Sequence, residues 1–191
     1  MTADSRVELY QRTRNLARTA VMAALTCLAG MALHWVPPAL VPFSILPMFV
    51  FLAGIVLGRN YGALAMLVYV ILGLFGLPVF ALPPFGGIAY LAMPTFGYLV
   101  GYIAGAYVAG TVYRAGSLWR ALFGALAGLA VLYVFGLAYL YVILNAVRHQ
   151  PTGVMAVLAA GFLPFIVGDL LKAAVAAWVG NEVVRRMAAM N

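Results

Sequence analysis

Two oppositely charged residues, Asp169 and Lys172, stand within the otherwise apolar stretch FLPFIVGDLLKAAVAAWVG at residues 162–180. On a helix, side chains three residues apart share one face, so these two can partly neutralise each other. A carboxylate accepts hydrogen bonds from N–H groups, and an ammonium donates them to carbonyl or carboxylate oxygens. The pair is either a polar floor beneath a ligand pocket or an ion pair that only holds helices together. We favour the pocket, because buried pairs seldom stabilise a fold much.

The sequence offers little for catalysis. Lys172 is the only lysine, and no P-loop motif is present, so the chain is not a P-loop ATPase. His34 and His149 fall at the ends of apolar segments, away from any serine arrangement typical of a nucleophilic site. The acidic residues besides Asp169 lie near the two termini: Asp4, Glu8 and Glu182. We therefore expect neither a catalytic site nor a metal or cofactor site.

The composition indicates what must position the charged pair. Of 191 residues, 66% are hydrophobic and 8% are charged, with a mean hydropathy of +1.08. A soluble domain carries about a quarter charged residues, so we expect an all-α integral membrane protein. The six predicted membrane spans are Ala17–Val36, Val41–Leu57, Tyr61–Phe80, Pro94–Tyr113, Leu118–Asn145 and Pro164–Val183. The apolar segment Thr152–Gly161 is too short to cross and is predicted to be a short helix at the outer face.

The basic residues predict the orientation. Nine arginines precede, separate or follow the spans on one side of the membrane: Arg6, Arg12, Arg14, Arg18, Arg59, Arg114, Arg120, Arg185 and Arg186. Only Arg148 lies on the other side. The positive-inside rule then puts both termini in the cytoplasm. We expect one membrane domain, 1–191, with a basic N-terminal segment (1–16), a six-helix bundle (17–183) and a cytoplasmic tail (184–191).

Two connections on the predicted outer side are rich in proline yet apolar. HWVPPALVPFSILPMF, residues 34–49, contains Pro37, Pro38, Pro42 and Pro47. GLPVFALPPFGGIAYLAMPTFGYL, residues 76–99, contains Pro78, Pro83, Pro84, Gly86, Gly87 and Pro94. Such sequences do not form regular helices. Irregular backbone near membrane depth is tolerated when it is buried or lines a cavity, so we favour a lid over an apolar ligand to a loop resting on the bilayer.

Glycines recur at four-residue spacing, as in Gly54 and Gly58, in Gly97, Gly101 and Gly105, and in Gly124 and Gly128. This spacing lets helices approach closely. We expect it to serve packing within one bundle rather than a dimer interface.

Three segments, in order, resemble a known family. LAGIVLGRNYGALAMLVYVILGLFGLPVF (52–80), GGIAYLAMPTFGYLVGY (86–102) and LPFIVGDLLKAAVAA (163–177) are similar to the corresponding segments of BioY. BioY is the biotin-binding S component of energy-coupling factor (ECF) transporters. The resemblance extends over about residues 41–177, which is nearly the whole predicted membrane domain.

The resemblance implies a six-helix subunit in the cell membrane that takes up the vitamin biotin from outside. It would pass biotin inward with a transmembrane coupling subunit and a pair of ATPases. By the same resemblance Asp169 and Lys172 contact the ligand, and the loops with Pro47, Gly86 and Gly87 act as gates. Ala20 and Ala24 match the small-residue pattern by which the first helix docks on the coupling subunit.

The sequence also departs from the family pattern. Phe85 stands in a stretch that is usually glycine-rich, Met93-Pro94-Thr95-Phe96-Gly97 replaces GPTGG, and Leu99 replaces an arginine of some members. These changes make the expected pocket more apolar. We take Phe85 as a ligand-binding candidate, and the polar candidates besides the charged pair are Ser44, Tyr90, Thr95, Tyr98 and Asn145.

Two other functions stay open from the sequence. The first keeps the fold but binds a more apolar carboxylate, such as lipoate or a biotin precursor. The second is a small structural or assembly membrane protein, in which Asp169 and Lys172 form only an internal clamp.

Overall fold

A computed structural model gives the structure of residues 3–35 and 44–189, and the part of the chain that it describes contains helices and no β-strand. The α-helices are α1 (Ala3–Ala32), α2 (Leu46–Leu74), α3 (Phe96–Val112), α4 (Leu118–Val142), α5 (Val154–Gly161) and α6 (Ile166–Ala189). Shorter helical turns are η1 (Leu33–Trp35), η3 (Ile88–Ala92) and the π-helical η4 (Ile143–Val147), which extends α4.

Helix α2 is broken at Gly58, whose backbone is not helical (φ 77°, ψ 173°). The chain folds back there: Gly62, after the break, lies so close to Ala53, before it, that a Cβ at Gly62 would be only 2.6 Å from the carbonyl oxygen of Ala53. The segments 46–57 and 59–74 correspond to the predicted spans Val41–Leu57 and Tyr61–Phe80. The second segment ends earlier than predicted, at Leu74, and Val41 lies outside the described residues.

Glycines bring α2, α3 and α4 into close contact. A Cβ at Gly54 would lie 2.4 Å from the carbonyl oxygen of Ala106. A Cβ at Gly105 would lie 2.9 Å from the carbonyl oxygen of Gly128, and one at Gly128 would lie 2.6 Å from that of Gly105. The prediction that the spaced glycines pack helices within one bundle is therefore confirmed for all of them except Gly58, where a Cβ would have nothing within 4 Å. The large side chains that this packing buries include Phe51, Met66, Tyr69, Phe80 and Leu132.

Several helix ends differ from those predicted. Helix α1 begins at Ala3, so the basic segment expected before Ala17 continues the same helix instead of forming a separate part. Helix α6 begins at Ile166 rather than Pro164 and runs to Ala189, which includes most of the expected tail. Pro47, expected in a gating loop, lies instead in the first turn of α2, where a missing N–H is harmless. The short helix predicted within Thr152–Gly161 is confirmed as α5.

The segment between α2 and α3, residues 75–95, is irregular, as its prolines and glycines predicted. Side chains of neighbouring helical segments bond its carbonyl oxygens: the Tyr69 hydroxyl bonds Val79 at 3.1 Å, and His34 Nε2 bonds Phe80 at 2.8 Å. Val79 and Phe80 are buried. The segment therefore packs on α2 and on the end of α1. In the other connection, Pro37, Pro38 and Pro42 lie outside the described residues.

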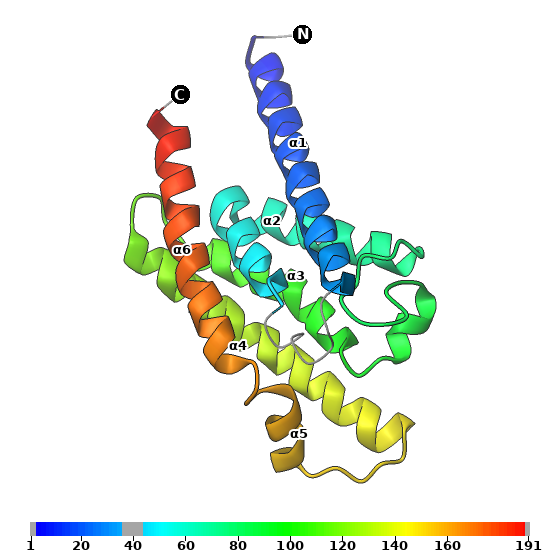
Figure 1. Ribbon diagram of the computed structural model, residues 1–191. Coiled ribbons are helices and arrows are strands. Elements are labelled where there is room, and N and C mark those ends of the chain that lie inside the picture. The colour runs from blue at the N-terminus through cyan, green and yellow to red at the C-terminus, as the bar shows by residue number, and fades with distance from the viewer. Residues whose placement is uncertain (1–2, 36–43, 190–191) are drawn as a thin grey trace.

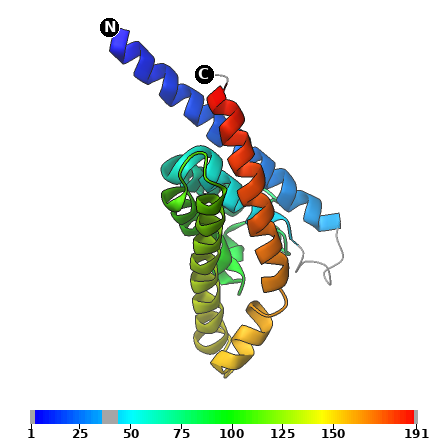
Figure 2. The same cartoon turned by 90° about the vertical axis from the view of Figure 1, so that its left-hand side faces the viewer.

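The two termini lie at the same end of the molecule, and α5 lies at the opposite end (Figure 1). A quarter turn shows the same arrangement (Figure 2). Within the described residues, three helices are long and apolar enough to cross a membrane: Glu8–Trp35, Leu46–Leu74 and Leu118–Val147. Helices α5 and α6, bent by 52° relative to each other, form a fourth if the pair is one span. The chain is thus a multi-pass helical membrane protein.

Candidate functional site

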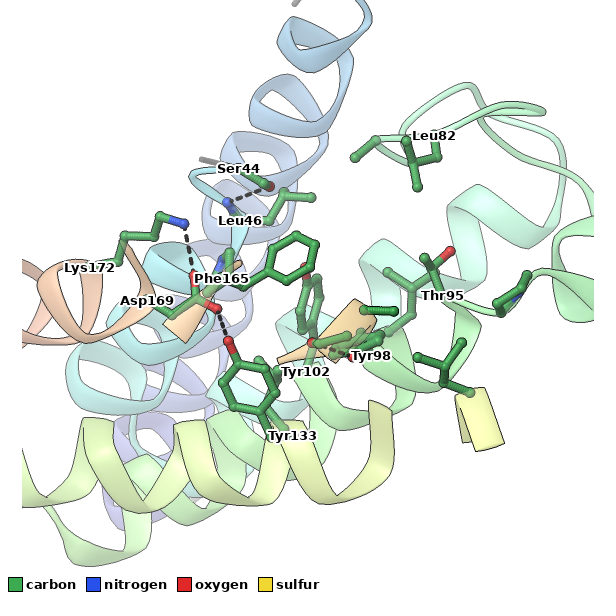
Figure 3. Close-up of a pocket in the computed structure, with 18 of the residues that line it drawn as sticks. Ser44, Leu46, Leu82, Thr95, Tyr98, Tyr102, Tyr133, Phe165, Asp169 and Lys172 are labelled. Atoms are coloured by element: carbon green, nitrogen blue, oxygen red, sulfur yellow. Dashed lines mark hydrogen bonds and ion pairs between the residues drawn. The ribbon is translucent and has the colours of Figure 1, made fainter. Parts of the chain in front are cut away.

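A cavity of about 250 Å³ lies among α2, α3, α4, the α5–α6 junction and the 75–95 segment. Its lining includes Gly161 at the end of α5 and Asp169 in the first turn of α6, so it lies on the α5 side of the molecule (Figure 3). Its walls are mostly apolar, with a few polar side chains. The lining residues are Ser44, Leu46, Pro47, Ala81, Leu82, Tyr90, Pro94, Thr95, Tyr98, Leu99, Tyr102, Leu132, Tyr133, Leu140, Ala160, Gly161, Phe165, Asp169 and Lys172.

Asp169 and Lys172 form an ion pair at the edge of this cavity. Lys172 Nζ lies 2.8 Å from Asp169 Oδ1, and the two side chains are 13% and 7% exposed, respectively. Tyr133 of α4 donates a hydrogen bond of 2.7 Å to the other carboxylate oxygen, Oδ2 (Figure 3). Asp169 stands in the first turn of α6, where the helix dipole favours a negative charge. The charged pair is therefore held by partners on two helices.

The bonds to Asp169 leave it able to bind a ligand. Each carboxylate oxygen accepts one protein hydrogen bond, and a carboxylate offers about four acceptor positions in total. An N–H group of a solute in the cavity can therefore bond Asp169 without displacing Lys172 or Tyr133. The ammonium of Lys172 carries the complementary positive charge for an oxygen atom of the solute.

Aromatic rings form the wall beside the pair. The ring of Tyr133 packs edge to face against Tyr98, with centroids 6.3 Å apart, and against Phe162 at 4.9 Å. The Tyr98 hydroxyl donates a 2.8 Å hydrogen bond to the carbonyl of Gly161 at the end of α5. These contacts connect α3 and α4 to the α5–α6 junction. They keep the aromatic wall in position around the charged pair.

Six of the eight residues proposed for ligand binding from the sequence line the cavity: Ser44, Tyr90, Thr95, Tyr98, Asp169 and Lys172. Ser44 Oγ accepts a 3.3 Å hydrogen bond from the N–H of Leu46, which begins α2. The hydroxyls of Tyr90 and Thr95 lie 3.4 Å apart. Pro47, proposed as a gating residue, is buried and also lines the cavity.

Phe85 and Asn145 do not line the cavity. The Phe85 ring lies against His34, with ring centroids 4.0 Å apart, and its backbone has a positive φ of 64°. The Asn145 side chain donates to the carbonyl of Thr152 at 3.1 Å and accepts from its N–H at 2.9 Å. Phe85 thus fastens the 75–95 segment to η1, and Asn145 fastens η4 to the chain that precedes α5.

The other proposed residues lie away from the cavity lining. Gly87 has φ 88° and donates a 2.7 Å hydrogen bond to the carbonyl of Gly73, and a Cβ at Gly86 would lie 3.0 Å from the same carbonyl oxygen. Both therefore hold the 75–95 segment against the end of α2. Ala20 and Ala24 are exposed on α1.

Sequence reasoning missed several cavity residues, of which Tyr102 and Tyr133 carry hydroxyls. Tyr102 follows Tyr98 by four residues on α3, so the helical period placed the two on one face and was a usable signal. Tyr133 is separated from Asp169 by 36 residues, and no spacing rule connects them. The remaining missed residues are apolar, including Leu82, Leu99, Leu132 and Phe165.

Membrane-length helices around a largely apolar cavity, with one buried charged pair at its edge, define a membrane protein that holds a small solute. A family model described as the BioY family matches residues 2–189. The chain belongs to the BioY family.

Curated relatives agree with this assignment. A protein of Lysinibacillus sphaericus named "Probable biotin transporter BioY" is 38% identical over 178 residues, which cover 92% of this chain and 89% of the relative. The "Biotin transporter BioY" of Thermotoga maritima is 37% identical over 170 residues, covering 87% of this chain and 93% of the relative. Both names describe transporters, in agreement with the expectation that the chain is not an enzyme.

A solved structure, the S-component for biotin from an ECF-type ABC transporter, has the same fold. Its TM-score is 0.74, and the match covers 96% of this chain and 94% of that chain. The sequences are 23% identical, so this likeness concerns the fold.

Proposed function

We propose that this chain is the biotin-specific S component of an ECF transporter. It captures biotin from the outer face of the membrane and delivers it inward together with a coupling subunit and ATPases. Family membership and the names of the curated relatives support the ligand. The fold of the solved S-component supports the transporter class.

The observation that carries the proposal is the polar group formed by Asp169, Lys172 and Tyr133 at the edge of an apolar cavity. Biotin has the complementary chemistry: a ring urea with two N–H donors and one carbonyl acceptor, joined to an apolar ring and an alkyl chain. Asp169 accepts from a urea N–H, and Lys172 donates to an oxygen. The aliphatic and aromatic walls bury the rest of the molecule.

The other residues of the proposed site act around this centre. Ser44, Tyr90, Thr95 and Tyr98 line the cavity and contact the ligand or its hydration water. Phe85 and Asn145 act indirectly, because their contacts hold the segments that enclose the cavity. Gating involves Pro47 at the start of α2 and the 75–95 segment with Gly86 and Gly87.

The proposal includes six spans in the inner or plasma membrane, with both termini in the cytoplasm and lipid around the bundle. The break at Gly58 supports this count, since α2 then supplies two antiparallel spans. The shared end of the two termini supports the orientation (Figure 1). The cavity, on the α5 side, then opens to the outside. The exposure of Ala20 and Ala24 on α1 supports docking of a coupling subunit there.

Equilibrium binding of biotin to the detergent-purified protein tests the function. Removing a hydrogen bond to a charged group typically loses about 1.5–3 kcal/mol, so Asp169→Asn should weaken binding roughly 10- to 150-fold. Glu182→Gln is the matched control, because Glu182 is also a carboxylate on α6 that pairs with a basic residue, Arg186, but lies outside the cavity. Loss of affinity in both variants, or no biotin binding by the folded wild-type protein, contradicts the proposal.

A second ligand class is favoured by one specific observation, the aliphatic lining contributed by Leu82, Leu99, Leu132 and Leu140. An apolar carboxylate such as lipoate, or a biotin precursor, also suits such walls. Competition of each compound against labelled biotin separates the two. If a compound displaces labelled biotin at a lower concentration than unlabelled biotin does, the site belongs to that compound.

A further inference from the structure

Four tyrosines line the cavity, and their hydroxyls are not equivalent. Tyr90 bonds Thr95, Tyr98 donates to the carbonyl of Gly161, and Tyr133 donates to Asp169. The hydroxyl of the fourth, Tyr102, makes no hydrogen bond to any residue that the structure describes. It is nevertheless largely removed from solvent, with 7% of its surface exposed.

The Tyr102 hydroxyl itself is not sealed off, because it is not among the fully buried, unpaired side-chain atoms of the described residues and its residue lines the cavity. A hydroxyl that meets the cavity without a protein partner can donate one hydrogen bond to a solute there. The phenol of Tyr102 also forms part of the cavity wall near Asp169 and Tyr133 (Figure 3). A solute bound to the charged pair would lie next to this wall. A hydroxyl kept in that position therefore points to a partner that arrives with the ligand.

We infer that the Tyr102 hydroxyl donates a hydrogen bond to the polar head of the bound solute and sets specificity for a ring urea. In biotin the acceptor is the ureido carbonyl oxygen. The inference rests on the proposed function and adds a specificity residue to it.

The donor direction follows from the neighbouring groups. Asp169 attracts an N–H of the urea, and the carbonyl of a ring urea stands between its two N–H groups. The carbonyl oxygen then lies next to Asp169, where it needs a donor rather than a second acceptor. The O–H group of a phenol supplies that donor. Lys172 and Tyr102 then both offer donors to the solute at this end of the cavity.

Removing the hydroxyl should weaken biotin binding moderately and should also reduce the preference for biotin over analogues with a poorer acceptor. A neutral hydrogen bond contributes enough that Tyr102→Phe should weaken biotin binding roughly three- to tenfold. A site that hydrogen-bonds a substrate group discriminates against analogues in which that group is weakened. The wild-type preference for biotin over 2-thiobiotin, whose sulfur is a poorer acceptor, should shrink by a similar factor in the variant.

The experiment measures the dissociation constants of biotin, desthiobiotin and 2-thiobiotin for the wild-type protein, Tyr102→Phe and Tyr107→Phe. Tyr107 is the matched control, because it lies on the same helix, is 43% exposed and does not line the cavity. Desthiobiotin keeps the urea, so Tyr102→Phe should weaken the binding of desthiobiotin by the same factor as the binding of biotin. The melting temperature without ligand should be unchanged or higher in Tyr102→Phe, since no protein partner is lost.

Three results would overturn the inference. If Tyr102→Phe binds biotin like the wild-type protein, the hydroxyl faces only water, and the proposed function still stands. An equal loss for biotin and 2-thiobiotin would mean that Tyr102 only shapes the cavity. A wild-type protein that is folded but binds no biotin would remove the proposed function and this inference together.

Discussion

At the residue scale, the charged pair has separate consequences for stability and for binding. Removing one member of a buried ion pair leaves an uncompensated charge and costs about 3–5 kcal/mol, whereas replacing both members is often nearly neutral. Asp169→Asn and Lys172→Met should each lower the melting temperature of the purified protein more than the double variant does. Biotin binding and uptake should be weakened in all three, because both groups contact the ligand in the proposed site.

A second ion pair on α6 provides the control. Arg186 Nε lies 2.8 Å from Glu182 Oε1, close to the separation of the buried pair, but both side chains are solvent-exposed, at 77% and 40%. Exposed pairs contribute little, so Glu182→Gln with Arg186→Met should affect neither stability nor binding appreciably. If instead the double variant of the buried pair expresses stably and supports normal uptake, the pair is only an internal clamp.

The sequence identified the pair but not its third member. Asp169 and Lys172 were detectable because charges inside an apolar span are costly and rare. Tyr133 was not, since its contact with Asp169 depends on how α4 packs against α6. Phe85 and Asn145 were selected for their residue type and position, yet local contacts occupy both side chains outside the cavity. Residue chemistry is readable from the sequence, whereas the direction in which a side chain points is set by packing.

At the element scale, the cavity depends on how closely α3 approaches the first segment of α2. In Gly54→Ala the new methyl group would lie 2.4 Å from the carbonyl oxygen of Ala106, so the helices must separate. Overpacking of this kind costs about 1–3 kcal/mol. We expect a lower melting temperature and weaker biotin binding, because both helices supply cavity-lining residues: Leu46 and Pro47 on α2, and Leu99 and Tyr102 on α3.

Gly153→Ala is the control for this substitution. Gly153 precedes α5 with φ −68°, which alanine also adopts, and nothing lies within 4 Å of the position that its Cβ would take. It should leave the melting temperature unchanged or slightly raised, since alanine reduces the entropy of the unfolded chain. Equal effects of Gly54→Ala and Gly153→Ala would show that close packing of α2 on α3 is not required.

Hydrophobic pattern and glycine spacing predicted which segments are helical, but not how each helix begins and ends. The break between the second and third predicted spans is one residue in a non-helical conformation, Gly58, so the two helical segments follow each other without a loop. The start of α6 is set by turns at residues 162–165, in which the Phe162 carbonyl accepts from the N–H groups of Phe165 and Ile166. Such backbone bonds leave no signal in side-chain hydropathy.

At the scale of the whole molecule, the proposed function assigns ligand capture and transport to different surfaces. The cavity lies on the α5 side, and the exposed alanines Ala20 and Ala24 lie on α1 outside the cavity lining. A coupling subunit seated on α1 therefore does not need to touch the ligand. Binding and energised uptake should be separable by substitutions on α1.

Ala20→Trp and Ala24→Trp test this separation. A tryptophan on an exposed helix face leaves the fold intact but blocks close helix approach, which depends on small residues in a membrane. We expect unchanged biotin affinity in detergent, together with loss of ATP-dependent uptake in proteoliposomes that contain the coupling subunit and the ATPases. Ala174→Trp, at an exposed alanine of α6, is the control and should retain uptake. If the α1 variants retain full uptake, the coupling subunit docks elsewhere on the bundle. Loss of uptake in Ala174→Trp alone would place the docking surface on α6.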